Sequence, residues 1–266
     1  MKPQTFSETV SAAVADLSAH GFDSIARLER WQREITYAAE RQARSSKDID
    51  ARLKDHLTKI FVSQITNGNA LKKHKIARWT LERIKPQLRL ELDRRILASA
   101  QLIKLNREAM IQKTLSRFSG WATSLPMGGS DAVDKREAAG DITKALKQLP
   151  YEVRRVHIDQ GFKLKASLDN IIATDGGAIA AIWHSRHGGG YNNRPEHAAR
   201  DGKVFVMRGN WAIEDGLMRL NGHQYTDEIE MVGEFVYCSC SYQYVYALRD
   251  LPPDMVTAKG RETLAK

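Results

Sequence analysis

The chain has 266 residues, of which 42% are hydrophobic and 27% are charged, enough for one large domain or two modest ones with a buried core. No run approaches the roughly 18 apolar residues of a membrane-spanning helix, and the N-terminus lacks the apolar stretch of a signal peptide, so we expect no membrane association. Two cysteines are too few for a disulfide framework, and they predict folding in a reducing cytoplasm.

The first 125 residues predict an elongated α-helical region. Glycine occurs there only at Gly21, Gly68 and Gly120, each at a point where an apolar period breaks, as glycines at helix ends do. One amphipathic helix is expected before Gly21, one through Leu28 to Ile35, and one from Ile49 to Ile60. The expected N-cap residues of the second and third helices are Asp23 or Ser24, and Ser46 or Asp48.

A long helix is expected from about residue 70 to residue 118. Its apolar residues recur every three, four or seven positions and form one stripe that would pack against neighbouring helices. Pro86 lies inside this pattern and predicts a kink or a short break, because proline lacks the amide donor. The stripe consists of Leu81, Ile84, Leu88, Leu92, Ile96, Ile103 and Met110.

The formal net charge is +9, and the whole excess lies in one segment. Residues 72–117 contain thirteen Lys or Arg against four Asp or Glu, while the rest of the chain balances. A stripe of one sign suits contact with nucleic acid or with an acidic protein surface; a solvated helix face is the plainer alternative. The candidate contact residues are Lys72, Lys73, Lys75, Arg78, Arg83, Lys85, Arg89, Arg94 and Arg95.

Residues 126–173 are expected to contain a linker and two helices. The linker runs from about Trp121 to Asp131 and includes Pro126 and three small residues at 128–130. Helices are predicted over 135–148 and 151–173, with Pro150 in the first turn of the second helix.

Residues 174–266 predict a small α+β module, because glycine, aromatic residues and β-branched runs replace the helical period. Residues 204–206 form one expected strand and residues 234–248 a longer one. In a regular strand, Cys238 and Cys240 would share a face with three tyrosines. The aromatic residues expected to pack this module are Trp183, Trp211, Tyr242, Tyr244 and Tyr246.

Five potential metal ligands lie between residues 182 and 240. Thiolate and imidazole are the usual ligands of zinc, although C-x-C is tighter than the preferred ligand spacing. Two alternatives stay open: the cysteines are small buried hydrophobic residues, or they form a strained disulfide. The candidate ligands are His184, His187, His197, Cys238 and Cys240.

Catalytic motifs give no comparable signal. The sequence contains no G-x-S-x-G elbow, no H-E-x-x-H and no Walker-type loop. Acid–base pairs could be assembled from Glu196 and His197 or from Asp201 and His187. The first pair is the weaker one, because side chains of adjacent residues point apart on regular structure. We therefore expect no enzymatic activity, and a metal-dependent hydrolase centred on the three histidines is the second alternative.

Four short blocks at the C-terminal end resemble the head-morphogenesis, or minor head protein, family of tailed bacteriophages, often called Mu F-like. They are the tetrapeptides 183–186, WHSR, 194–197, RPEH, and 202–205, GKVF, followed by Cys238-Ser239-Cys240. Many relatives carry C-x-x-C or C-x-x-H in the second block, where only His197 remains here, and an arginine where this chain has Ser239. The resemblance covers about a quarter of the chain.

The resemblance implies a non-enzymatic component of the virion head, assembled in the host cytoplasm, with several copies near the portal. Portal or capsid proteins would be its partners, and packaged DNA could contact the basic helices. We expect no cofactor, and a structural zinc is the alternative. A DNA-contacting internal virion or ejection protein is the first alternative function, motivated by the basic stripe.

Overall fold

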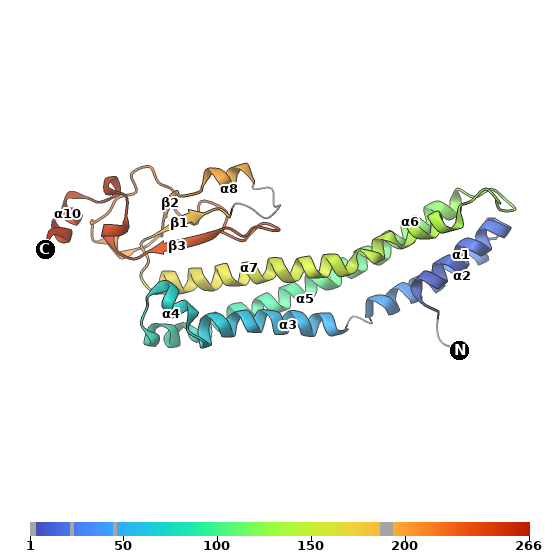
Figure 1. The fold of residues 1–266 in the computed structure, drawn as a ribbon, viewed down its shortest axis with the longest axis horizontal. Coiled ribbons are helices and arrows are strands. Elements are labelled where there is room, and N and C mark those ends of the chain that lie inside the picture. The colour runs from blue at the N-terminus through green and yellow to red at the C-terminus, as the bar shows by residue number, and fades with distance from the viewer. Residues whose placement is uncertain (1–3, 22–23, 45–46, 187–193) are drawn as a thin grey trace. The chain divides into compact units, whose positions relative to one another are not determined.

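The computed structural model describes residues 4–21, 24–44, 47–186 and 194–266 (Figure 1). In these ranges the chain is mainly helical with one small antiparallel sheet near the C-terminus, which confirms the expected fold class. None of the described helices is long and apolar enough to cross a membrane. The main elements are α1 Phe6–His20, α2 Ile25–Arg44, α3 Lys47–Phe61, α4 Asn69–His74, α5 Arg78–Thr123, α6 Lys135–Lys147, α7 Leu149–Asp175, β1 Ala180–His184, α8 Pro195–Ala199, β2 Val204–Val206, α9 Trp211–Glu214, β3 Ser241–Val245 and α10 Ala258–Ala265. Short helical turns cover Val62–Thr66, Leu248–Asp250 and Pro253–Met255.

The chain forms two compact units that alternate along the sequence. The first unit contains Met1–Leu53 and Ala98–Val156, and the second contains Lys54–Leu97 and His157–Lys266. The boundaries fall inside α3, α5 and near the start of α7, so these helices contribute to both units. The expected division of the chain at residues 125 and 173 follows composition and stays a prediction.

In the first unit, α1 packs against α2 and α6. A capping box starts α1: the Thr5 hydroxyl accepts from the Glu8 amide, and the Glu8 carboxylate accepts from the Thr5 amide. Asp16 of α1 accepts a hydrogen bond of 2.6 Å from the Trp31 indole of α2. The Ser24 hydroxyl accepts from the Arg27 amide, which confirms Ser24 as an N-cap residue of α2. Asp23, Ser46 and the side chain of Asp48 lie outside the described residues.

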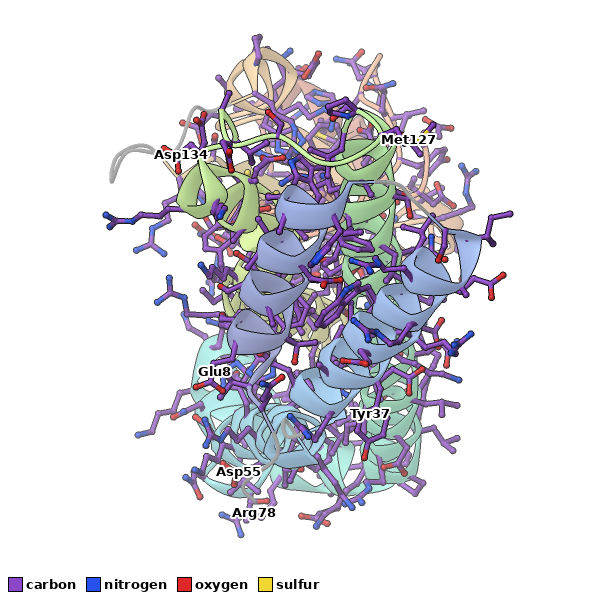
Figure 2. The ribbon with its side chains drawn as sticks, turned by 90° about the vertical axis from the view of Figure 1, so that its right-hand side faces the viewer. Glu8, Tyr37, Asp55, Arg78, Met127 and Asp134 are labelled. Carbon is purple, nitrogen blue, oxygen red and sulfur yellow. The ribbon has the colours of Figure 1, made fainter. Side chains whose placement is uncertain are left out.

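A close backbone contact joins the end of α1 to the segment that follows α5. Gly21 has a φ of 67° and forms a β-bridge with Met127. A Cβ atom on Gly21 would lie 2.3 Å from the Gly129 nitrogen, so only glycine fits there. Glu8, Tyr37, Met127 and Asp134 mark this unit in Figure 2. The Tyr37 and Met127 side chains are exposed.

The expected long helix over 70–118 differs from the structure at both ends. It is interrupted at residues 75–77, where Lys75 adopts a left-handed φ of 52° and ends α4. It also continues to Thr123, so Gly120 and Trp121 are helical and not part of a linker. The helix runs through Pro86 without a break, because apolar residues on both sides of the proline, including Leu81 and Leu92, lie in the same core. The helices predicted over 135–148 and 151–173 are confirmed as α6 and α7, with Pro150 in the first turn of α7.

The second unit contains the sheet, whose strand order is β2-β1-β3 with both pairs antiparallel. Ala180 pairs with Val206 and Val245, and Trp183 pairs with Tyr242. Alternate residues of β1 enter two different cores. The first core contains Ile179, Ala180, Val204, Val206, Leu217, Met218, Val245, Met255 and Val256. The second contains Ala166 of α7 together with Ala181, Trp183, Phe205, Val232 and Tyr242.

The strand expected over 234–248 is shorter in the structure. The prediction of β2 over 204–206 is confirmed, but β3 covers only Ser241–Val245. Turns precede β3, with Gly233 at a φ of 79° and Tyr237 at a φ of 60°. Both cysteines therefore lie in the loop before β3, and the expected strand face shared by both cysteines and three tyrosines is wrong.

Candidate functional site

The described residues bring three of the five candidate ligands together. The Nδ1 atom of His197 lies 3.5 Å from the Sγ atom of Cys238 and 3.5 Å from the Sγ atom of Cys240. All three ligand atoms lie within 4.8 Å of one another. His197 and Cys238 are buried, and Cys240 is half-buried. We call these three residues the His–Cys cluster.

Local backbone structure explains how the His–Cys cluster forms. His197 lies on the one-turn helix α8, which begins at Pro195. Cys238 lies at the end of a turn, where its amide donates to the Phe235 carbonyl at 3.0 Å. The left-handed Tyr237 directs its amide to the Asp159 carboxylate on α7 at 2.8 Å. These contacts fix the loop that carries both thiols beside α8.

Aromatic rings surround the His–Cys cluster. The indole of Trp183 lies edge-on to His197, with ring centroids 5.3 Å apart, and Phe235 lies 5.6 Å from the same imidazole. Tyr242 packs edge-on against Trp183 at 5.5 Å. The Nε2 atom of His197 is buried without a hydrogen-bond partner among the described residues. Thus Nδ1, which faces the sulfur atoms, is the ring nitrogen that makes polar contacts.

The two thiols have opposite pKa shifts. The hydrogen bond with Cys240 is the largest influence that lowers the pKa of Cys238, to about 5, and it acts against burial. Backbone amides of Cys240 and Gly233 and the charge of His197 lower this pKa further. The same bond and burial raise the pKa of Cys240 above its ordinary value. The hydrogen bond between the two sulfur atoms thus favours ionisation of Cys238 over ionisation of Cys240.

The other two candidate ligands are not part of this cluster. His184 ends β1, and its exposed ring contacts the Gln243 side chain, with 3.1 Å between Nε2 and Oε1. His187 lies outside the described residues. The Asp201 carboxylate, considered as an acid–base partner, accepts from the Ser185 amide at 2.7 Å.

The aromatic residues expected to pack the module have different roles. Trp183 is fully buried and Tyr242 is 4% exposed, so both belong to the core. Tyr244 and Tyr246 pack partly against Ala173, Ala178 and Met207. Trp211 is 38% exposed, and its indole donates to the Gly177 carbonyl at 3.1 Å. Trp211 thus fixes the entry to the sheet and is not a core residue.

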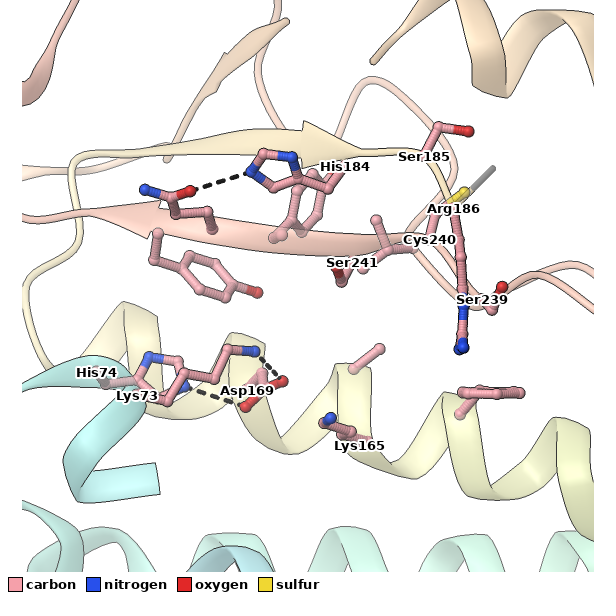
Figure 3. Close-up of a pocket in the computed structure, with 16 residues that line it drawn as sticks. Lys73, His74, Lys165, Asp169, His184, Ser185, Arg186, Ser239, Cys240 and Ser241 are labelled. Carbon is pink, nitrogen blue, oxygen red and sulfur yellow. Dashed lines mark hydrogen bonds and ion pairs between the residues drawn. The ribbon is translucent and has the colours of Figure 1, made fainter. Parts of the chain in front are cut away.

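Sequence reasoning missed a buried polar network around Asp169 of α7 (Figure 3). Its carboxylate lies 3.1 Å from His74 Nε2 and 2.5 Å from Lys73 Nζ. The other His74 ring nitrogen, Nδ1, lies 2.6 Å from the Tyr246 hydroxyl. Burial opposes ionisation of Asp169, but the bonds and charges of His74 and Lys73 lower its pKa overall. No sequence pattern indicates that His74 and Asp169 meet, because they belong to different helices and 94 residues separate them.

A cavity of about 570 Å³ extends between this network and the end of β1. Three basic side chains, Lys73, Lys165 and Arg186, line it together with His184 and Cys240. Figure 3 shows Asp169 and Lys165 on α7 facing Ser241 of β3 across this space. The cavity reaches the His–Cys cluster only through Cys240, because neither His197 nor Cys238 lines it.

Most of the candidate contact residues of the basic stripe form ion pairs within the chain. Six of the nine do so, among them Lys73 with Asp169 and Arg83 with Asp175. The other four are Lys85, Arg89, Arg94 and Arg95, which pair with acidic residues of the same helix. Those acidic residues already belong to the charge balance of residues 72–117, so among these six pairs only the ones with Asp169 and Asp175 reduce its positive excess. In the described part of the chain no ion pair involves Lys72, Lys75 or Arg78.

Comparisons of the chain with protein-family models, with curated proteins and with solved structures give no match.

Proposed function

We propose that this chain is a minor head or head-morphogenesis protein of a tailed bacteriophage, with a structural role in assembly. The observation that carries the proposal is the convergence of the four blocks that resemble that family. Trp183 of the first block, His197 of the second, Phe205 of the third and the two cysteines all belong to one packed group. Blocks separated by up to 57 positions in sequence thus build one local structure.

Burial of this group supports a structural role over turnover chemistry. Trp183 is 0%, His197 4% and Cys238 5% exposed. Trp183 and Phe235 pack against the His197 imidazole, and the neighbouring cavity reaches the group only through Cys240. Such an arrangement is typical of a group that holds chain segments together.

The apolar surface of α5 supports a role with protein partners. Trp79, Leu90 and Leu97 are 67%, 71% and 75% exposed. Their spacing of 11 and 7 residues places them within about 20° of one another around the helix. Large exposed apolar residues that share one face of a helix are candidate contacts for a protein partner. We propose that a portal or capsid protein covers this stripe in the head, where several copies of the chain would lie near the portal.

Mass spectrometry of gradient-purified particles from the encoding phage tests this proposal. We expect the chain in DNA-filled heads at fewer copies than the major capsid protein. We also expect deletion of its gene to reduce the yield of filled heads. Two double variants are compared. Leu90→Glu combined with Leu97→Glu changes the apolar stripe, whereas Glu82→Gln combined with Glu108→Gln changes other surface positions of the same helix and is the control. Absence of the chain from purified particles, or full particle yield without it, would refute the proposal.

A second candidate function, contact with DNA inside the virion, rests on three cations that form no ion pair with the described residues. Lys72, Lys75 and Arg78 lie within seven residues, next to the exposed Trp79. Cations beside an exposed aromatic ring suit a nucleic-acid backbone with its bases. Charge reversal at the three cations should abolish salt-dependent DNA binding, whereas reversal of the paired Lys85 and Arg89 should change it little. Equal affinity of both variants would remove this candidate.

A further inference from the structure

We propose that His197, Cys238 and Cys240 bind one Zn²⁺ ion through Nδ1 and the two Sγ atoms, with a solvent oxygen as the fourth ligand. The ion would tie α8 to the loop before β3. This inference is independent of the role in head assembly, because it concerns a property of the purified chain.

The distances within the His–Cys cluster fit a tetrahedral zinc site. Zinc bonds of about 2.3 Å to sulfur and about 2.05 Å to nitrogen, at the tetrahedral angle, place sulfur and nitrogen about 3.6 Å apart. The structure places Nδ1 3.5 Å from both sulfur atoms. Thus both sulfur–nitrogen edges of the tetrahedron already have the required length.

One cation would satisfy all three side chains at once. Nδ1 lies at the same distance from both sulfur atoms, but one imidazole nitrogen can form a well-aligned hydrogen bond with only one of them. A cation between the three atoms would bind the nitrogen lone pair and both sulfur atoms together.

The surroundings favour sulfur in its anionic form when a cation is present. The Gly233 amide donates to Cys238 Sγ at 3.4 Å, which orients the sulfur and stabilises negative charge on it. Trp183 and Phe235 exclude water from the imidazole side. Buried thiolate charge is costly without a positive partner, so a dication in this position would be held strongly.

The ligand set selects zinc over other common ions. Two thiolates and an imidazole are soft or borderline donors, whereas Mg²⁺ and Ca²⁺ require oxygen ligands. No carboxylate joins the three ligands in the described part of the chain. Cys240 is half-buried and lines the 570 Å³ cavity, so water can reach the fourth position from that side.

The test uses the full chain, produced without an affinity tag in zinc-supplemented medium. Elemental analysis should find about one zinc per chain, and X-ray absorption should fit two sulfur atoms and one imidazole in the first shell. Cobalt reconstitution should give thiolate-to-metal absorption that Cys238→Ser and Cys240→Ser each weaken. His184→Gln is the matched control and should keep full zinc content, because His184 lies outside the cluster.

A second measurement covers the case in which the cysteine variants fail to fold. Chelation of the wild-type chain should lower its Tm by several degrees, and added Zn²⁺ should restore it. Folded wild-type protein with less than about a tenth of an equivalent of zinc, and no change in Tm when Zn²⁺ is added, would overturn the proposal. A first shell without sulfur, or zinc content that survives both cysteine substitutions, would overturn it equally.

Discussion

Asp169→Asn tests a buried electrostatic network of the second unit. The Asp169 carboxylate joins α7 to His74 and Lys73 of the α4 segment. Its side chain is 8% exposed and that of His74 is 1% exposed, so both groups depend mainly on protein partners for hydrogen bonds. Because a carboxylate only accepts hydrogen bonds, His74 Nε2 is the donor to Asp169. Asparagine keeps the shape and one acceptor oxygen but removes the charge that Lys73 faces.

The size of the effect follows from burial. Removing one partner of a buried ion pair costs about 3–5 kcal/mol. Lys73 is 33% exposed and can turn towards solvent, and asparagine can still accept from His74, so we expect the lower end, about 3 kcal/mol. The matched control is Asp175→Asn on the same helix. Asp175 pairs with Arg83, whose side chain is 56% exposed, and a surface pair of this kind contributes about 0–1 kcal/mol.

The pH dependence gives a second criterion. The pKa of Asp169 is lowered in the folded chain. Its contribution to the free energy of unfolding is therefore complete above the unfolded-state pKa of about 3.9, and it is lost as the pH falls through the folded-state pKa. The free-energy gap between wild type and Asp169→Asn should therefore narrow in acid. Because the chain forms two units, urea unfolding is best followed by pulsed hydrogen exchange of peptides from 162–175 and 241–246. Equal stability of the two asparagine variants at pH 7, or a gap that widens below pH 3.9, would refute this reasoning.

Two further predictions concern packing. Gly140→Ala should stabilise the first unit by about 0.5–1 kcal/mol, because a Cβ atom meets nothing within 4 Å in the interior of α6. Gly260→Ala should destabilise the C-terminal module by about 1–3 kcal/mol, because its Cβ atom would lie 2.2 Å from the Leu217 carbonyl oxygen. Thermal unfolding of the two alanine variants measures the difference, and equal Tm shifts would contradict the prediction. Leu92→Ala should cost about 2–5 kcal/mol, since Leu92 is fully buried, whereas Leu97→Ala should stay within about 0.5 kcal/mol because Leu97 is 75% exposed. Urea denaturation compares these two, and a similar loss at both positions would show that α5 packs differently.

Helical periodicity was the most reliable guide to the fold because it depends on many residues at once. The apolar stripe through Leu81 and Leu92 predicted α5, and the structure buries both leucines. The ends of α5 were missed because single residues decide them. Lys75 ends α4 in a left-handed conformation, which a lysine rarely adopts and which no pattern announces. Gly120 was expected to end a helix, but nothing in its surroundings requires an end there.

Local patterns identified part of the candidate site, and long-range contacts account for the rest. Concentration of histidine and cysteine pointed to His197 and both cysteines. The network of His74, Asp169 and Tyr246 combines an expected basic helix, an expected core helix and an expected strand. Each member has an ordinary local explanation, so only the fold reveals that they meet. The role of the basic stripe stays a prediction: composition counts its charges, and the fold adds which acidic side chains lie beside them.

The loop before β3 decides whether the C-x-C sequence can chelate an ion. Alternation of polar and apolar residues favoured a strand through both cysteines, and a strand would place their Cα atoms about 6.6 Å apart with parallel side chains. Two sulfur atoms bound to one ion lie at most about 4.6 Å apart, so the side chains of a flat strand would have to lean towards each other. The turn at Tyr237, with its φ of 60°, ends the extended pattern, and both sulfur atoms lie 3.5 Å from one imidazole nitrogen. The Asp159 carboxylate holds this turn from α7. An irregular segment fixed by a helix thus brings both cysteines to the same side of His197.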